Sequence, residues 1–478
     1  MMKQISAQAI ASVLLLSLLS ACGSSGTTEV QTTADTAPQT TEAVTEAGPA
    51  FPDVTFGGEA IHFLTEECTF GDIYTSFEIY AAGMDGSLIN DTVYNRNMVI
   101  EERFDVHITE DRLQNAAKKA YSVVLAGEDV YDVVMPYLND SVSNAIAGLY
   151  LNLFDVENLH LENSWWDQRA NENLQLGGKL YFTTGDISIL DNECTMVFLF
   201  NKEMAAQNDL ADPYTMVREG TWTMDALFEL CAGLTRDLNG DGIQKDTDDQ
   251  YGIYCAFNMP HSLFFGSGER IAVANESGEL ELVMYNERSA EVADKLFEYC
   301  LAPEVMTGNE RNNAFMEGRL FMSSHAQSDI DTFRDAKFDF GILPYPKYDT
   351  AQKDYYSFIS TILTPGVSIP VTNAEPETAG LILEAMAYYS VDTLTHAYYD
   401  VTLNDRYIRD EDSGDMLDII FATRVYDFGF IFDVGGLGTM IQNMFSSRNS
   451  NFASQYEKFE KKAQAALVDL TAAFEGAQ

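Results

Sequence analysis

Basic residues are scarce in this chain. Its 478 residues include 28 lysines and arginines against 74 aspartates and glutamates, which gives a formal net charge of −46 at pH 7. A surface with so large an excess of negative charge repels polyanions and anionic lipid headgroups. We therefore exclude nucleic acid as a partner, and we exclude attachment to the membrane through surface charge.

The chain also has few histidines and no recognisable catalytic motif. None of its six histidines stands at metal-ligand spacing, and there is no nucleophile elbow, H-E-x-x-H motif or kinase signature. We therefore predict a protein that is not an enzyme, with no catalytic residues and no cofactor for chemistry. Acidic residues are so numerous that their pairing is uninformative, and a glycosidase carboxylate pair stays an open alternative. The histidines are His62, His107, His160, His261, His325 and His396.

Cysteines are few, and their spacing matches no zinc site and contains no C-x-x-C motif. Those that follow Cys22 lie in apolar or mixed segments, which favours buried free thiols. A single disulfide, for example between Cys231 and Cys255, stays open as an alternative outside the cytoplasm. The five are Cys68, Cys194, Cys231, Cys255 and Cys300.

Long apolar runs are lacking except at the N-terminus. The run over residues 10–19 is too short to span a bilayer, but it suits a secretory signal, and Lys3 precedes it. The Leu-Ser-Ala-Cys stretch at 19–22 resembles the lipobox of bacterial lipoproteins. We expect residues 1–21 to be a lipoprotein signal peptide and Cys22 to carry the lipid; the alternative is an ordinary signal peptide with a chance cysteine.

Residues 22–50 are rich in Thr, Ala, Glu, Gly and Ser, with almost nothing to bury. Such a segment cannot offset its own ordering entropy, so we expect a disordered, Thr-rich spacer. It would hold the folded body away from the extracytoplasmic face of the cell membrane. The lipid anchor would be the protein's only membrane attachment.

From residue 51 onward, segments with strand and helix periodicity alternate, which predicts an α/β fold with a largely parallel sheet. The predicted strands cover 59–65, 104–109, 131–138, 179–184, 196–200 and 338–343. The predicted helices cover 89–104, 116–126, 223–234, 290–300, 378–389 and a C-terminal stretch that includes 456–470.

The sharpest local motif is a calcium-type loop. Oxygen-bearing side chains at positions 1, 3 and 5, a glycine at 6 and a carboxylate at 12 match such a loop. Position 12 is Asp in place of the usual Glu, and a strand-like segment follows, so a solvated turn is the alternative. We expect a structural calcium ion held by Asp237, Asn239, Asp241, the Ile243 carbonyl and Asp248.

Three other stretches are candidates for contact with a solute. Trp165 and Trp166 precede Asp167, and indole faces stack on sugar rings while a carboxylate accepts sugar hydroxyls; the alternative is that both indoles lie in the core. Residues 266–270 form a Gly-rich stretch without the setting of a phosphate loop, which favours a solute-contacting loop or a plain hairpin. Tyr345 lies in a rigid turn between two prolines.

Several stretches together resemble a known family, the extracellular solute-binding proteins (family 1 type) of ABC importers, and in particular their carbohydrate-binding lipoproteins. The resemblance covers nearly all of 51–478, and the calcium-type loop is similar to one in some oligosaccharide-binding members. The stretches are Asn90–Arg96, Trp165–Asp167, Gly178–Asp186, Phe200–Lys202, Gly220–Trp222, Gly341–Lys347 and Met416–Ile420.

The resemblance implies a two-lobed, periplasmic-binding-protein-like fold of type II. Each lobe would be a mainly parallel sheet flanked by helices, and the solute would lie in a cleft that closes by a hinge motion. By analogy the chain crosses between the lobes near Asp191, Arg319 and Ile369. Lobe one would then be 51–190 plus 320–370, and lobe two 191–319 plus 371–478.

The resemblance further implies a monomer that captures a carbohydrate, in particular an oligosaccharide, and delivers it to the permease subunits of an ABC transporter. A surface glycoside hydrolase and a sensory sugar-binding lipoprotein without transport are the alternatives. The expected cleft residues are Trp165, Trp166, Asp167, Asn192, Glu193, Glu269, Arg270 and Tyr345, with Asp186 and Asp85 as secondary candidates.

Overall fold

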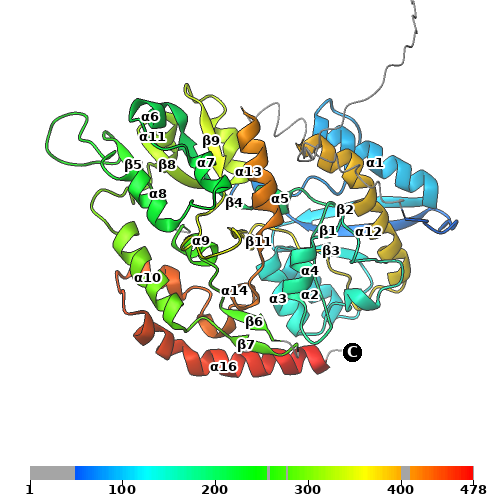
Figure 1. Ribbon diagram of the computed structural model, residues 1–478. Helices are drawn as coiled ribbons and strands as arrows, with labels where there is room; N and C mark the ends of the chain where they lie inside the picture. Colours follow the sequence, from blue (N-terminus) through cyan, green and yellow to red (C-terminus); the bar gives the residue numbers. More distant parts are fainter. Residues whose placement is uncertain (1–48, 256–258, 276–277, 400–409, 477–478) are drawn as a thin grey trace, which may run out of the picture. The chain divides into compact units, whose positions relative to one another are not determined.

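The computed structural model of the chain describes residues 49–255, 259–275, 278–399 and 410–476. Residues 50–478 form one compact unit, shown as a ribbon in Figure 1. The expected signal peptide, Cys22 and all of the expected spacer up to residue 48 lie outside the described residues. Within the described ranges, no helix combines the length and the hydropathy needed to cross a membrane.

The first sheet is entirely parallel. Its central strand β1 (Glu59–Glu66) is flanked by β2 (Val106–Leu113) and β3 (Val133–Met135). The second half of β1 is buried at every residue, as expected for a central parallel strand. Helices α1 (Leu88–Phe104) and α2 (Ala116–Leu125) supply the crossovers that parallel strands require.

The second sheet has mixed strand directions. Strand β4 (Met196–Asn201) lies between β8 (Leu320–Ala326) and β9 (Phe340–Leu343) and is antiparallel to both, whereas β5 (Tyr251–Ile253) is parallel to β8. β4 and β8 are buried along their whole length, which agrees with the apolar run of β4 and of the first half of β8. The first sheet is thus parallel as expected, while two of the three pairings in the second are antiparallel.

The packing differs from the expected division into lobes in two places. Strands β8 and β9 fall within 320–370, yet they pair with β4 in the second sheet. Helix α12 (Pro376–Ser390) falls within 371–478, yet it packs against α1 beside the first sheet (Figure 1). An apolar run indicates a buried element but not which sheet it joins, so sequence periodicity could not fix these assignments.

Three chain segments lie side by side where the chain passes between the two sheets. The Ser360 N–H donates to the Cys194 carbonyl (2.9 Å), and β10 (Ser357–Phe358) pairs in parallel with β11 (Arg424–Val425). Ser368, ten residues after the end of β10, bridges to Val134 in β3 of the first sheet. We call these three segments, which connect the two sheets, the crossing segments.

The expected strand over 179–184 is wrong, because this stretch makes only isolated bridges, such as that of Thr183 with Val367. The expected strand over 131–138 ends early, since Pro136 cannot donate to a ladder. The later helices are confirmed as α8 (Met224–Cys231), α10 (Glu287–Cys300), α12 and α16 (Phe452–Gly476).

The remaining elements are short helices and one hairpin. They are η1 (Asp72–Tyr74), α3 (Leu138–Ile146), η2 (Leu153–Asp155), α4 (Gln168–Leu174), α5 (Leu190–Glu193), α6 (Lys202–Gln207), α7 (Pro213–Arg218), α9 (Met259–Gly266), β6 (Ala272–Ala274), β7 (Leu280–Leu282), α11 (Arg311–Met316), η3 (Gln327–Phe333), η4 (Val391–Thr395), α13 (Glu411–Ala422), α14 (Phe428–Ile431), η6 (Val434–Gly436) and α15 (Met440–Ser446).

One disulfide joins Cys255 to Cys300, while Cys68, Cys194 and Cys231 are buried free thiols. The sequence left open a bond between Cys231 and Cys255, and the structure gives Cys255 a different partner.

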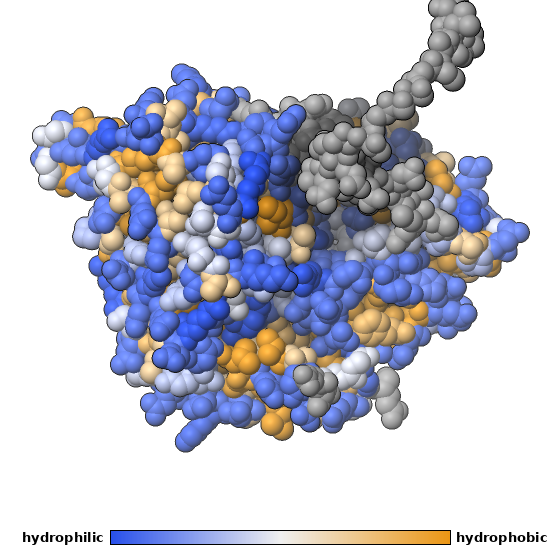
Figure 2. Space-filling view, in the orientation of Figure 1, coloured by the Kyte–Doolittle hydropathy of each residue, from blue (hydrophilic) through white to orange (hydrophobic). Residues whose placement is uncertain are grey.

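Figure 2 shows that the face seen in Figure 1 is mostly hydrophilic, with hydrophobic residues in separate patches. This surface agrees with the large acidic excess of the sequence.

Candidate functional site

A cavity of about 390 Å³ is lined by segments that are far apart in the sequence. One wall is the start of α3, directly after the first sheet's β3. Another is β10 with the crossing segment that follows it, and the rest comes from α9, from α14 and α15, and from the turn between these two helices. The lining residues are Asn139, His261, Phe358, Ser360, Thr361, Ile362, Phe430, Asp433, Gly438, Thr439 and Gln442.

Two buried polar atoms in this lining have no protein partner. They are Oδ1 of Asn139 and Oγ1 of Thr361, and neither has a hydrogen-bond partner within the described part of the chain. Leaving a buried polar atom unpaired costs on the order of 1–3 kcal/mol, so such atoms are usually satisfied by water or a ligand. The two residues are also tied together, because the Asn139 N–H donates to the Thr361 carbonyl (3.3 Å).

Aromatic rings form the apolar part of the lining. The ring of Phe430 lies edge-on to Phe358 and to His261, with centroids 5.2 and 5.6 Å away. Burial lowers the pKa of His261 to about 4, so the imidazole is neutral at pH 7. Its Nε2 lies 3.1 Å from the Gly438 carbonyl, which can only accept, so the proton is on Nε2.

Among the described residues, the lining carries a single carboxylate, that of Asp433, and no lysine or arginine. A neighbouring cavity of about 320 Å³ shares Asn139 and contains Lys118 and Asp140, whose charges offset each other. The whole recess therefore offers hydroxyl, amide and carboxylate groups beside ring faces. That combination suits a solute with many hydroxyl groups.

None of the eight residues expected in the cleft lines this cavity. Trp165 and Trp166 are buried, and both indole N–H groups donate to the carboxylate of Glu384 on α12 (3.1 and 2.8 Å). Asn163 Nδ2 and the backbone N–H of His160 donate to the same carboxylate (2.7 and 3.1 Å). Both indoles thus have packing and hydrogen-bonding roles, and their contact with a ligand stays a prediction.

Asp167 and Asn192 meet at a buried ionic cluster on the crossing segments. Arg424 of β11 lies 2.7 Å from Asp167 Oδ2 and 3.1 Å from Asp191 Oδ2, and it donates to Asn192 Oδ1 (2.8 Å). Tyr426 also donates to Asp167 (2.8 Å). Burial raises the pKa of Asp191 to about 7 although Arg424 lowers it. The cluster joins the segment before β4 to β11.

The other expected residues are dispersed. Glu269 pairs with Arg288 (3.2 Å) and accepts from Asn286, the N-cap residue of α10. Arg270 lies over the Tyr356 ring at 4.6 Å and donates to the Glu269 carbonyl (2.7 Å). Both residues therefore stabilise the region between α9 and α10.

Glu193 and Tyr345 lie apart from these residues. Burial, and then the carboxylates of Glu78, Asp331 and Asp191, raise the pKa of Glu193 well above its usual range. Tyr345 is fully buried, packs on Phe198 with centroids 4.7 Å apart and hydrogen-bonds Ser324.

The two secondary candidates for the cleft, Asp186 and Asp85, also form hydrogen bonds within the protein. Asp186 accepts from Thr395 (3.0 Å), and burial raises its pKa to about 6. Asp85 accepts from the Ser87 N–H (2.8 Å) just before α1.

The calcium-type loop is closed by its own hydrogen bonds. The Asp237 carboxylate accepts from the N–H groups of Gly240 and Gly242, both at 2.7 Å, and Lys245 Nζ lies 2.7 Å from Asp241 Oδ2. Gly242 has φ +76°, which fits the turn that position 6 of such a loop requires. The described residues contain no cluster of three or more metal-ligating side chains, so the chelating arrangement stays a prediction.

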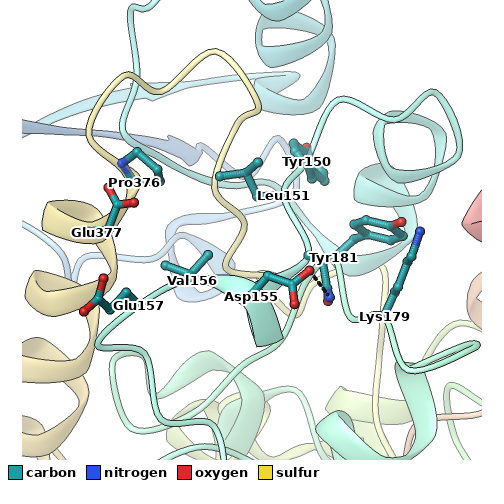
Figure 3. A pocket seen from close by; sticks show the side chains of 10 residues that line it. Tyr150, Leu151, Asp155, Val156, Glu157, Lys179, Tyr181, Pro376 and Glu377 are labelled. Carbon is teal, nitrogen blue, oxygen red and sulfur yellow. Dashed lines mark hydrogen bonds between the residues drawn. The ribbon is translucent and has the colours of Figure 1, made fainter. Parts of the chain in front are cut away.

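A second cavity, of about 280 Å³, lies beside the first sheet only and is drawn in Figure 3. Its labelled residues come from 150–157, from Lys179 and Tyr181, and from the start of α12 at Pro376 and Glu377. It takes no residue from the crossing segments or from the second sheet. We therefore take the 390 Å³ cavity as the candidate site.

Solved structures show the fold that this arrangement belongs to. No protein-family model matches the chain, and no curated protein matches its sequence. A cyclo/maltodextrin-binding protein complexed with maltotetraose has a TM-score of 0.56 at 16% identity, covering 87% of this chain and 97% of that protein. UspC of M. tuberculosis gives 0.56 at 13% identity, over 85% and 100% of the two chains.

The GacH receptor of Streptomyces glaucescens, solved unliganded and with acarbose, gives a TM-score of 0.51 at 12% identity, over 88% and 100% of the two chains. At these identities the likeness is one of fold. The chain has the two-lobed, periplasmic-binding-protein-like α/β fold of type II, so the predicted fold class is confirmed, whereas the expectation of a mainly parallel sheet in each lobe is wrong for the second sheet.

Proposed function

We propose that this protein is the solute-binding component of an ABC importer and captures a carbohydrate, in particular an oligosaccharide, in the 390 Å³ cavity. The observation that carries the proposal is that this cavity is lined from the first sheet's side, from a crossing segment and from α9, α14 and α15 together. A solute held there touches both halves at once. Proteins of similar fold complexed with maltotetraose or acarbose support a sugar as the solute.

The lining provides the two kinds of contact that a sugar needs. The unpaired oxygens of Asn139 and Thr361 take hydroxyl donors, and the rings of Phe358 and Phe430 take the apolar faces. These groups come from segments on both sides of the cavity. A bound sugar therefore favours a closed conformation, in which the two lobes approach each other, only if it makes better contacts in that conformation than in an open one.

We propose binding without turnover. A glycosidase places two carboxyl groups about 5–9.5 Å apart across the scissile bond. The described lining supplies one, Asp433, and its other polar groups are hydroxyls, amides and a neutral imidazole. Recovery of the bound glycan intact, by mass spectrometry, is the expected result, whereas shortened products would favour the hydrolase.

Location and delivery are also parts of the proposal. Cys22 would hold the protein as a monomer at the extracytoplasmic face, within reach of the permease. A Cys22→Ala variant is expected to be released from the membrane fraction with its binding intact. Retention of this variant in the membrane fraction would contradict the lipid anchor, and sugar binding without uptake through a permease would favour the sensory alternative.

The binding test is calorimetry against mono- and oligosaccharides. We expect a binder in the micromolar range, and Phe430→Ala and Thr361→Val should each weaken it about tenfold or more, since each removes one kind of contact. Trp222→Phe, in the core and away from the lining, is the control and should leave the affinity unchanged. No measurable binding of any sugar, together with binding of a peptide, would overturn the assignment of a sugar as the solute.

A further inference from the structure

We propose that Asp433 makes this cavity select its sugar by charge, so that an amine-bearing sugar binds more tightly than the neutral sugar of equal length and linkage. The inference rests on the proposed function, because it requires that a sugar binds in the cavity. The inference goes beyond the proposed function because it names the chemical class of the sugar and the residue that determines the preference.

The Asp433 side chain is held in a fixed position by a tight turn. The residue has φ +40°, its N–H donates to the Phe430 carbonyl (3.1 Å), and its carbonyl accepts from Gly436 (3.0 Å). Its Oδ1 accepts from the Gly438 N–H (3.1 Å). No described residue donates a hydrogen bond to Oδ2, and Asp433 is an exposed residue that lines the cavity, so this oxygen can accept from a ligand there.

The surroundings leave this negative charge without a competing cation in the lining. His261 is neutral at pH 7, and no described lining residue is a lysine or arginine. Lys462 of α16 is close enough to lower the pKa of Asp433, but it is not among the described residues that line the cavity. Partial burial raises the pKa of Asp433, although the hydrogen bond from the Gly438 N–H and the charge of Lys462 lower it.

The same edge of the cavity is rich in acceptors. A Cβ added at Gly438 would lie 2.9 Å from Asp433 Oδ1 and 3.2 Å from the Phe430 carbonyl, so both acceptors lie close to Gly438, which itself lines the cavity. An ammonium group donates three hydrogen bonds and is attracted to an aromatic face. A carboxylate or phosphate on the sugar would add acceptors and a like charge, and is excluded for the same reason.

The test compares matched trisaccharides by calorimetry at about pH 6, where a sugar amine is protonated. The probes are α- and β-1,4-linked glucose trisaccharides, their 2-amino-2-deoxy counterparts and the corresponding uronic acid trimers. We expect the amino sugar to bind at least about tenfold more tightly than its neutral counterpart, as charge-assisted hydrogen bonding predicts, and the uronate not to bind.

Asp433→Asn keeps Oδ1 and tolerates a positive φ, and it should reduce the preference to within about twofold. Asp294→Asn, on the exposed face of α10, removes the same charge elsewhere and should leave the preference intact. Equal or weaker binding of the amino sugar, or an undiminished preference in Asp433→Asn, overturns the inference while the proposed function stands. Failure of every sugar to bind overturns both.

Discussion

Arg424→Met removes the one cation among the described residues that contacts the buried carboxylates of Asp167 and Asp191 on the crossing segments. The guanidinium lies 2.7 and 3.1 Å from their oxygens, and all three side chains are largely buried. Methionine keeps the length and the packing of the stem but leaves both carboxylates uncompensated. Breaking a buried ion pair in this way typically costs about 3–5 kcal/mol.

The two carboxylates differ in the support that remains. Asp167 still accepts from Tyr426 and from the N–H groups of Arg169 and Ala170, whereas Asp191 keeps only the Asn192 N–H (2.8 Å). We therefore expect a loss near the lower end, about 3 kcal/mol at pH 8. The loss should shrink near pH 5.5, because Asp191 then takes up a proton and no longer needs the cation.

The assay is urea unfolding followed by tryptophan fluorescence, since Trp165, Trp166 and Trp222 are all buried. Arg424→Met combined with Asp191→Asn should recover about 1–2 kcal/mol of the loss at pH 8. A loss below about 1 kcal/mol, or a double variant no more stable than the single one, would refute the ionic account of this junction.

Three further predictions concern single groups. Glu384→Gln should lower the free energy of unfolding by about 1–3 kcal/mol, because one amide oxygen cannot accept all four donors that face the carboxylate; equal stability in urea titrations would contradict this. The Asp191 carboxyl holds its proton to about pH 7 when folded and to about pH 4 when unfolded, so its contribution to stability falls as the pH rises between these values and is constant above them. Between pH 5.5 and 8 the wild type should therefore lose more stability than Asp191→Asn, and identical slopes in thermal melts would argue against the raised pKa. Calcium should bind to the loop with measurable heat that Asp237→Asn abolishes, since a carboxylate ligand is lost; a calorimetric trace without heat for the wild type would remove the calcium site.

The periodic features of the sequence predicted most of the fold. The strand at 59–65 and the helix at 89–104 follow from apolar spacing and appear with small shifts as β1 and α1. Spacing cannot say which sheet a strand joins, and for this reason β8 and α12 were expected in the wrong halves. The Lys179–Thr184 stretch has the sequence pattern of a strand, but it makes only isolated bridges with described residues, such as that of Thr183 with Val367.

The candidate site was much harder to predict. The side chains of Trp165, Trp166 and Asp167 form hydrogen bonds and ion pairs with residues that are distant in the sequence. The sequence around these three residues gives no indication of those partners. Glu384 did carry a signal, as a lone charge within the apolar run of α12, which indicates a buried carboxylate with donors around it. Thr361 and Asp433 carried none, because a cavity is formed by segments that only the folded chain brings together.

Capture of a sugar in the 390 Å³ cavity can be tested by mass spectrometry of the solute that the protein carries through purification from cells grown on mixed oligosaccharides. We expect an intact glycan that is released on unfolding and is lost or strongly reduced in Phe430→Ala. A peptide or another solute without sugar units, carried equally by the wild type and by Phe430→Ala, would contradict it.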